Sequence, residues 1–238
     1  MNISMKRIQA IFMKDYKEFS RNYAISIMLF FPIVFAIFYR SDAPSTMFMY
    51  AFVLNFSLSM MTSFIQACLI AEEKEKNTLR SLMMTPASIF DVLFGKSLFV
   101  IMMSSVIFAV TVYILGYFPD STSFIWFVIS LLLSIVLYTS LGTICGLYSK
   151  TVMEATLAIF PVLIIFTMGQ FGVFLEERFA AASVLQYLPS AQLAELMEAS
   201  INNYTMSDLI KPTVIIAVWM VVVTVISIVL YKKRLMDE

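Results

Sequence analysis

The chain has 238 residues, of which 61% are hydrophobic and 13% are charged, and its 16 basic and 16 acidic residues leave no formal net charge. A soluble domain of this length cannot bury so much apolar surface, so most of that surface must face lipid. Histidine is absent, which excludes Ser–His hydrolysis, histidine-dependent acyl transfer and most catalytic zinc sites.

The segment before the first long apolar run is expected to form an amphipathic helix over residues 3–20. It would lie in the membrane interface, with its apolar stripe at the headgroup boundary and its cations near anionic lipid. A simple cytoplasmic extension of the first span is the alternative. The apolar stripe would consist of Met5, Ile8, Phe12, Tyr16 and Phe19.

Apolar runs that could cross a bilayer recur along the rest of the chain. A spanning helix needs about 20 apolar residues, and a helix satisfies its own backbone hydrogen bonds in lipid. We therefore expect an all-α membrane protein with six transmembrane helices, the first only marginal in length. The six runs cover residues 22–40, 47–71, 97–117, 124–148, 155–175 and 212–231.

The basic residues orient this expected bundle. With the N-terminus inside, 13 of the 16 Lys and Arg residues lie on the cytoplasmic side, and only Arg40, Arg178 and Lys211 lie outside. Cytoplasmic loops of membrane proteins carry such an excess. The bias predicts a multi-pass protein of the cell membrane, of the bacterial plasma-membrane type, with both termini in the cytoplasm. An odd number of spans would place the basic tail, residues 232–238, outside.

The second expected span carries a row of polar side chains. Polar residues within a membrane helix either bond neighbouring helices together or line a wet cavity. Helix packing is the default interpretation, and lining of a substrate path is the alternative. The candidates for the path are Asn55, Ser59, Thr62, Ser63 and Gln66.

A dense run of charges follows this span, and residues 72–96 are expected to form a cytoplasmic loop. Thr78 can cap a short helix, and Thr85 followed by Pro86 can start a second helical turn. The pattern predicts a short amphipathic helix roughly parallel to the membrane, with Asp91 facing water. The helix capped by Thr78 would carry Leu79, Leu82 and Met83 on one side. After the second turn, Ile89, Phe90, Leu93 and Phe94 would pack back onto the membrane domain.

Three further features are expected from the sequence. Gly142 and Gly146 have the small-xxx-small spacing that lets membrane helices approach closely. Residues 176–211 form a long outer segment that is too short to span and could dip into the membrane as a re-entrant hairpin. The two cysteines, Cys68 and Cys145, lie in apolar runs and are expected to be buried, inert thiols.

The acidic residues indicate where the energy for any transport must come from. Every Asp and Glu falls in a loop, a tail or the end of a span. Transporters driven by protons or ions usually need charged or titratable groups inside the membrane. A separate protein that supplies the energy is therefore the economical explanation.

The charged run resembles the type-2 ABC transporter permeases, which are half-size membrane subunits of ATP-driven exporters. That family has a Glu-x-Glu-Lys/Arg-Gly-Thr-Leu pattern after its second span, followed by a Thr-Pro turn. Here residues 73–79 read EKEKNTL, with Asn77 in place of the glycine, and residues 85–86 read TP. Weaker matches occur at residues 91–96, 141–142 and 187–190.

The resemblance implies a role for each part of a single permease domain. Residues 1–21 would be the connecting helix, residues 22–231 the six-span bundle, and residues 176–211 its outer re-entrant helices. Loop 72–96 would be a coupling helix that docks on an ATP-binding subunit, and Ser149, Lys150 and Glu154 a second cytoplasmic contact. The implied coupling residues are Glu73, Glu75, Asn77, Thr78, Leu79, Leu82, Met83, Thr85, Pro86 and Asp91.

The implied partners are a cytosolic ATP-binding subunit, which would bind ATP and Mg, a second copy or a sister permease, and membrane lipids. The chain itself would hold no ATPase site, cofactor or metal, and would bind no nucleic acid. The resemblance implies export, and the short outer loops suggest a hydrophobic or amphipathic cargo: a drug, a peptide or a lipid-like molecule. A polysaccharide or ion exporter, a membrane-embedded lipid-modifying enzyme and a sensory partner are alternatives. We further hypothesise that Glu73 and Glu75 pair with basic residues of the ATPase or of the connecting helix.

Overall fold

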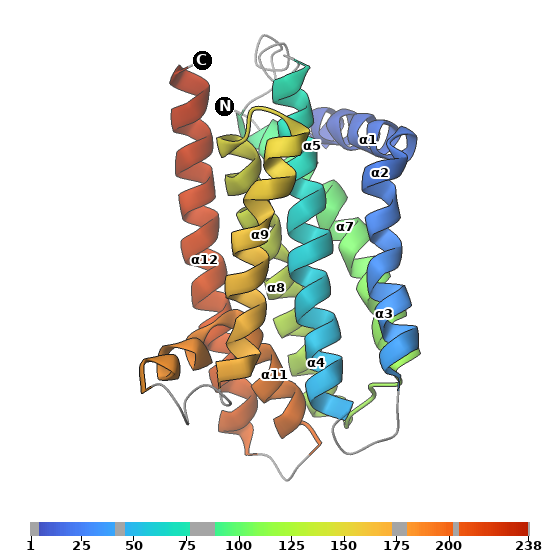
Figure 1. Cartoon of the computed structure of the whole chain (residues 1–238), viewed down its shortest axis with the longest axis vertical. Helices are drawn as coiled ribbons and strands as arrows, with labels where there is room; N and C mark the ends of the chain where they lie inside the picture. Colours follow the sequence, from blue (N-terminus) through green and yellow to red (C-terminus); the bar gives the residue numbers. More distant parts are fainter. Residues whose placement is uncertain (1–4, 41–45, 77–88, 173–179, 202–204, 238) are drawn as a thin grey trace.

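The computed structural model describes residues 5–40, 46–76, 89–172, 180–201 and 205–237. These residues form helices joined by turns, without a strand among them, which confirms the all-α prediction. The helices stand side by side in one bundle (Figure 1). Five are long and apolar enough to cross a membrane: Met47–Glu75, Asp91–Leu115, Ser121–Tyr148, Val152–Phe171 and Met206–Lys233.

The first expected span, 22–40, is not one continuous helix. It consists of α2 (Tyr23–Ser26), a 3-10 turn, η1 (Ile27–Phe30), and α3 (Phe31–Tyr39). Pro32 lies at the start of α3 and lacks a backbone N–H, so an unbroken ladder of α-helical hydrogen bonds cannot pass through this point. Its apolar helical part, Ile27–Tyr39, is shorter than a typical span.

The N-terminal helix, α1 (Met5–Arg21), lies across one end of the bundle, transverse to the long helices (Figure 1). The amphipathic helix is therefore confirmed, but its stripe is only partly right, because Met5 is 76% exposed and Tyr16 is 48% exposed. The reason is that Asp15, which makes a buried ion pair, takes a place on the inner face. The residues buried on α1 are Ile8, Ile11, Asp15 and Phe19.

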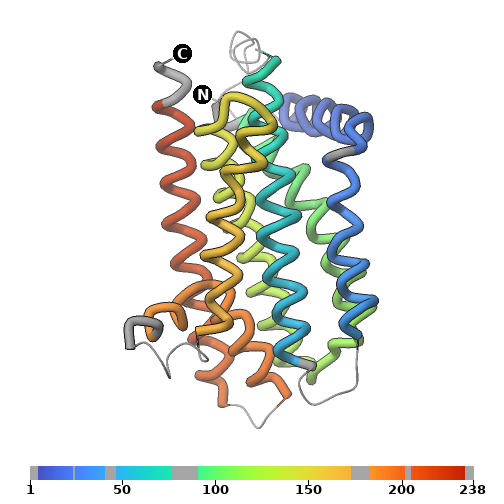
Figure 2. Tube along the Cα trace, in the orientation of Figure 1, coloured from blue at the N-terminus to red at the C-terminus, as the bar shows by residue number. Residues whose placement is uncertain are grey.

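A single rod through the middle of the bundle is made by α4 (Thr46–Ser57), a π-helical turn, η2 (Leu58–Ser63), and α5 (Phe64–Glu75). It is the most deeply buried of the five candidate spans. The trace in Figure 2 shows the rod running the length of the bundle between its neighbours. Residues 72–75 belong to this rod, so the expected loop does not begin at residue 72.

The next three helices follow the rod in sequence and pack against it: α7 (Ile89–Leu115), α8 (Ser121–Tyr148) and α9 (Val152–Met168). Asp120 caps α8 by accepting hydrogen bonds from the N–H groups of Thr122 and Ser123. Near the other end of α8, a Cβ atom at Gly142 would lie 2.4 Å from the carbonyl oxygen of Ser63. A Cβ atom at Gly146 would lie 2.7 Å from the carbonyl oxygen of Ala67. Only glycine permits this close approach of α8 to the rod.

The end of the bundle opposite α1 is closed by short helices. After α9 and η3 (Gly169–Phe171) come η4 (Ala180–Tyr187) and α11 (Pro189–Ala199), and the last helix, α12 (Met206–Asp237), returns to the end that carries α1 (Figure 1). The indole N–H of Trp219 donates to the carbonyl oxygen of Tyr187 at 2.8 Å. The last helix begins six residues before the expected span, so residues 206–211 belong to it and not to the outer segment. Both cysteines are free.

Candidate functional site

A buried ionic cluster joins three helices at the end of the bundle that carries α1. The Lys96 Nζ atom on α7 lies 2.8 Å from Glu73 Oε1 on α5 and 3.3 Å from Asp15 Oδ1 on α1. None of these three side chains is more than 1% exposed. Ions removed from water are stable only with close counter-charges, so the contacts depend on one another. We call Lys14, Asp15, Glu18, Glu73 and Lys96 the Lys96 cluster.

Lys14 and Glu18 complete the cluster at its open side. The Lys14 ammonium pairs with Glu73 Oε1 and lies 3.4 Å from Glu18 Oε2. Burial works against the charge of Lys14, but the attraction and hydrogen bond of Glu73, with help from Glu18 and Asp15, hold the pKa of Lys14 above its usual value. Both lysines therefore contribute positive charge to the same carboxylate oxygen.

Asp15 is the fully buried acid that α1 contributes to the cluster. Burial raises the pKa of Asp15 above its usual value; the attraction of Lys96 offsets part of the rise, and repulsion from Glu73 adds to it. Because a glycine lies beside Lys96 in the sequence, α1 can sit directly on α7: a Cβ atom at Gly95 would lie 3.0 Å from the Ile11 side chain. This contact positions the Asp15 carboxylate over Lys96.

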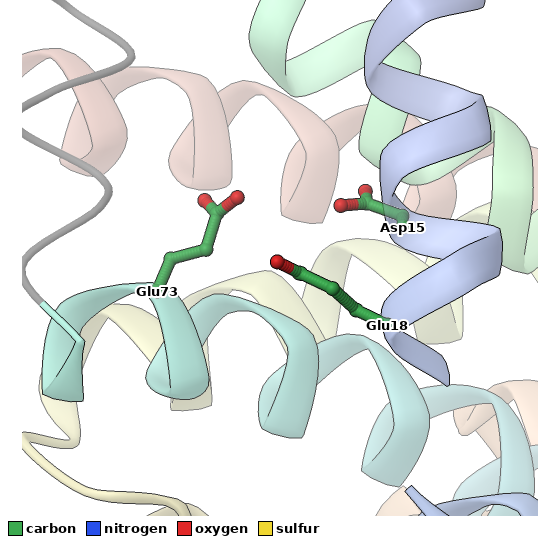
Figure 3. A group of neighbouring side chains, drawn as sticks. All are labelled: Asp15, Glu18 and Glu73. Carbon is green, nitrogen blue, oxygen red and sulfur yellow. The ribbon is translucent and has the colours of Figure 1, made fainter. Parts of the chain in front are cut away.

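The three carboxylates also have the arrangement of cation ligands. Figure 3 shows Asp15 and Glu18 on α1 and Glu73 on α5 pointing toward one another. One oxygen of each lies within 4.8 Å of the others. The ammonium groups of Lys14 and Lys96, however, sit among the same oxygens and supply the positive charge. The geometry therefore describes an ion-pair cluster rather than a metal centre.

A second ion pair lies beside the cluster. Arg7 on α1 approaches Asp91 at 3.5 Å, and the Asp91 side chain is fully buried. The prediction that Asp91 faces water is wrong. Because α7 already begins at Ile89, Asp91 lies in its first turn, where a carboxylate also interacts favourably with the helix dipole, and the helix packs against α1.

The expected second cytoplasmic contact is attached to the end of α5. Glu75 Oε2 accepts the backbone N–H of Val152 at 2.9 Å, and Lys74 donates to the carbonyl oxygen of Leu147 at 2.7 Å. Within the turn, the backbone N–H of Lys150 donates to Glu154 Oε2, and the Ser149 hydroxyl donates to the carbonyl oxygen of Cys145. The short turn between α8 and α9 is thus fixed to the same helix that carries Glu73.

A comparison with family models matches residues 1–229 to a family described as ABC-2 family transporter protein. The chain belongs to the ABC-2 transporter family. It is therefore a multi-pass membrane component of an ABC transporter, a class in which a separate subunit hydrolyses ATP and is the membrane component's partner. A comparison with curated proteins found no match.

In this ABC-2 protein, part of the predicted coupling set lies outside the described residues: Asn77, Thr78, Leu79, Leu82, Met83, Thr85 and Pro86. The helices that flank them are described. The Lys96 cluster holds the last turns of α5 to the first turns of α7, with α1 across both. The hypothesis that Glu73 pairs with a basic residue of the N-terminal helix agrees with its ion pair with Lys14. Glu75 instead accepts a hydrogen bond from the turn after α8.

Sequence reasoning missed Asp15, Lys14 and Lys96. A signal for Asp15 was present, because this acid lies four residues from Ile11 and four from Phe19, on a face that is otherwise apolar. A charged residue at the centre of an apolar helical face needs a buried partner. The identity of that partner, 81 residues away, could not be read from spacing.

The polar row of the second span makes contacts between helices of the same chain. Asn55 donates to Gln170 Oε1 and to the carbonyl oxygen of Ser190, and Gln66 donates to Thr143 Oγ1. Ser59, Thr62 and Ser63 contact Thr167, Ser104 and the carbonyl oxygen of Tyr138. All five side chains are buried. These contacts match the helix-packing interpretation, and in this conformation none of the five lies on an open path.

Proposed function

We propose that this ABC-2 protein is the permease subunit of an exporter that moves a hydrophobic or amphipathic molecule outward. The energy would come from ATP hydrolysed by a separate ATP-binding subunit. Family membership and the charged run after the second span support this proposal. A large apolar exterior also supports it, since a cargo that partitions into lipid reaches such a surface without crossing water. On α9 that exterior includes Met153, Leu157 and Ile164.

We also propose six crossings, with both termini in the cytoplasm. Residues 23–39 run beside α4 from the end that carries α1 to the opposite end (Figure 1). Seventeen helical residues rise about 25 Å, a few ångströms less than a hydrocarbon core of about 30 Å. Local thinning of the bilayer accommodates such a mismatch at modest cost. Both chain ends lie at the same end of the bundle, as an even number of crossings requires.

The observation that carries the proposed mechanism is the burial of Lys96 between Asp15 and Glu73. This contact couples the helices on either side of residues 77–88, the segment proposed to dock on the ATPase. A displacement of that segment would be passed to α5, and hence to the central rod, and to α1. The turn between α8 and α9 would move with them through Glu75. We propose that a second copy or a sister permease completes the path.

The test uses the full chain in native membranes. We expect a soluble ATPase to co-purify in a fixed ratio, and ATP-dependent efflux to appear when both are reconstituted in vesicles. Replacing Leu79 and Leu82 with Asp should abolish both while membrane insertion persists. Leu79→Met with Leu82→Met is the matched control and should retain both.

Two outcomes would overturn the proposal. If no ATPase co-purifies under several mild detergents, the exporter interpretation loses its energy source. If the ATPase binds but no tested amphipathic molecule moves, a sensory role replaces transport. Unchanged transport in the double Asp variant would instead reject the docking role of residues 77–88 alone.

A further inference from the structure

A groove lies between α7, α8 and α12. Its volume is about 240 Å³, and its lining is mostly apolar. Helix α8 forms the floor, because it packs extensively against α12 and also contacts α7, whereas α7 and α12 share few direct contacts. At the end of the groove nearer the C-terminus, Leu230 and Tyr231 of α12 belong to one apolar cluster with Val92 and Leu93 of α7. Ser97 and Ile101 line it on α7, Val136 and Ser140 on α8, and Ser227 and Ile228 on α12.

The groove lies in the half of the bundle nearer α1. On α7, Ser97 directly follows Lys96 of the buried cluster. On α12, Ser227 and Ile228 lie in the last third of the helix, which runs to the end of the bundle that carries α1 (Figure 1). The outer surface around the groove is apolar: Phe94, Val225 and Val229 are all exposed. A molecule in the groove would therefore sit in the lipid leaflet at the end of the bundle that carries α1.

Of the hydroxyl groups that line the groove, four are hydrogen-bonded within the described part of the protein and two are not. On α12, the Thr224 hydroxyl lies 3.0 Å from that of Ser140. On α8, Thr139, Ser140 and Thr143 donate to carbonyl oxygens one turn earlier in their own helix, so their donors are already used. The hydroxyls of Ser97 and Ser227 make no hydrogen bond with any described residue. Both residues line the groove, Ser97 from α7 and Ser227 from α12. Each can donate to an oxygen on a ligand whose remaining surface is apolar.

The mouth of the groove is basic on the side nearer the chain end. Lys232 follows Ile228 by four residues, so it lies one turn further along the same face of α12. Lys233 follows it, and both side chains are exposed. If the anionic headgroup of a lipid lay beside these lysines, the acyl chains of that lipid would begin near Ser227 and Ile228.

We propose that this groove binds one acyl chain of an anionic phospholipid. The ester oxygens would accept hydrogen bonds from Ser97 and Ser227, and the phosphate headgroup would lie beside Lys232. The bound chain would fill the space between α7 and α12 and so support the helix that carries Lys96. The lipid is a bound ligand, not the cargo, and the site is independent of the transport proposal.

The primary test maps the site in the unaltered protein. The full chain is placed in phosphatidylcholine nanodiscs that contain a small fraction of phosphatidylglycerol with a photoreactive acyl chain. We expect cross-links to concentrate on groove residues of α7 and α12, such as Ile101 and Ile228. Unlabelled phosphatidylglycerol should reduce them several-fold, whereas additional phosphatidylcholine should not.

Two variants and a matched control sharpen the result. Ser97→Phe fills the groove and should reduce the cross-links several-fold. Val106→Phe adds the same ring to α7 at a position that is 60% exposed and outside the groove, and it should leave them unchanged. Lys232→Gln should remove the preference for phosphatidylglycerol over phosphatidylcholine while chain cross-links persist with either lipid.

The proposal is overturned if labelling is spread evenly over the exposed apolar surface, or if phosphatidylcholine competes as well as phosphatidylglycerol. It is also overturned if Ser97→Phe folds and labels like Val106→Phe. Displacement by a neutral amphipathic drug, with no effect of phosphatidylglycerol, would reassign the groove to cargo. If Ser97→Phe does not fold, the map and the competition in the unaltered protein decide the question.

Discussion

Lys96 and Glu73 form a 2.8 Å ion pair in which each side chain is 1% exposed. The pair links the start of α7 to the end of α5, and Lys14 and Asp15 connect it to α1. Neither lysine can be removed without leaving a buried carboxylate short of positive charge. Single substitutions can therefore test whether the cluster stabilises the fold.

Lys96→Met should lower the free energy of unfolding by about 3–5 kcal/mol, the usual effect of removing one partner of a buried ion pair. Thermal unfolding in detergent would measure the change. Lys150→Met, at an exposed position on the turn between α8 and α9, is the control and should have little effect. Equal losses in the two variants would mean that Lys96 is not a structural counter-charge.

Asp15→Asn should change how stability depends on pH. Because the folded-state pKa of Asp15 is raised, the stabilisation linked to this group is present below its unfolded pKa of about 3.9 and is lost as pH rises through the folded value. The Asn variant cannot lose that contribution. Its stability relative to the unaltered protein should therefore be greater at neutral pH than at about pH 4.

Unfolding of both proteins followed over this range provides the measurement for Asp15. The linked contribution of Lys14, whose pKa is also raised, is lost only above its unfolded pKa of about 10.4, so it does not interfere. Parallel pH profiles for the two proteins would contradict the interpretation.

Gly142→Ala should destabilise the bundle by about 1–3 kcal/mol, the usual range for overpacking. The new Cβ atom would lie 2.4 Å from the carbonyl oxygen of Ser63, and a backbone atom cannot move aside without shifting the rod. Leu132→Ala, on an exposed part of the same helix, is the comparison and should cost little. The same melting point for both variants would show that α8 can move away from the rod freely.

Glu75→Ala should reduce ATP-dependent efflux while the ATPase still binds, if the turn between α8 and α9 moves with α5. The variant removes the acceptor for the Val152 N–H. Glu75→Gln keeps an oxygen at the same position and should restore most of the rate. Efflux from vesicles and co-purification of the ATPase separate the two effects. Full activity in the Ala variant would show that this hydrogen bond plays no part.

Much of the fold was predictable from apolar run length alone, because a membrane helix must satisfy its own backbone in lipid. The five long helices follow from that rule, and the interruption before Pro32 follows from the missing N–H. The predicted start of the charged loop was wrong because α5 continues through residues 72–75. These residues lack the apolar pattern of a span, and ion pairs of Glu72 and Glu73 stabilise the last helical turn instead.

The buried cluster was not predictable in the same way. Its contacts join residues 59 and 81 positions apart, and single-sequence spacing gives no information on such pairs. Asp91 shows the same limit. An acid beside an amphipathic pattern usually faces water, but here Arg7 on α1 covers it.

The π-helical turn Leu58–Ser63 has a consequence for both ends of the central rod. A π turn holds about one more residue than an α turn, and one residue corresponds to a rotation of about 100° in an α-helix. Above the turn, Glu73 faces Lys96; below it, Asn55 faces Gln170. If the turn became α-helical, one half of the rod would rotate relative to the other, and either Glu73 or Asn55 would lose its partner. The rod can therefore satisfy both ends together only while this turn keeps its extra residue.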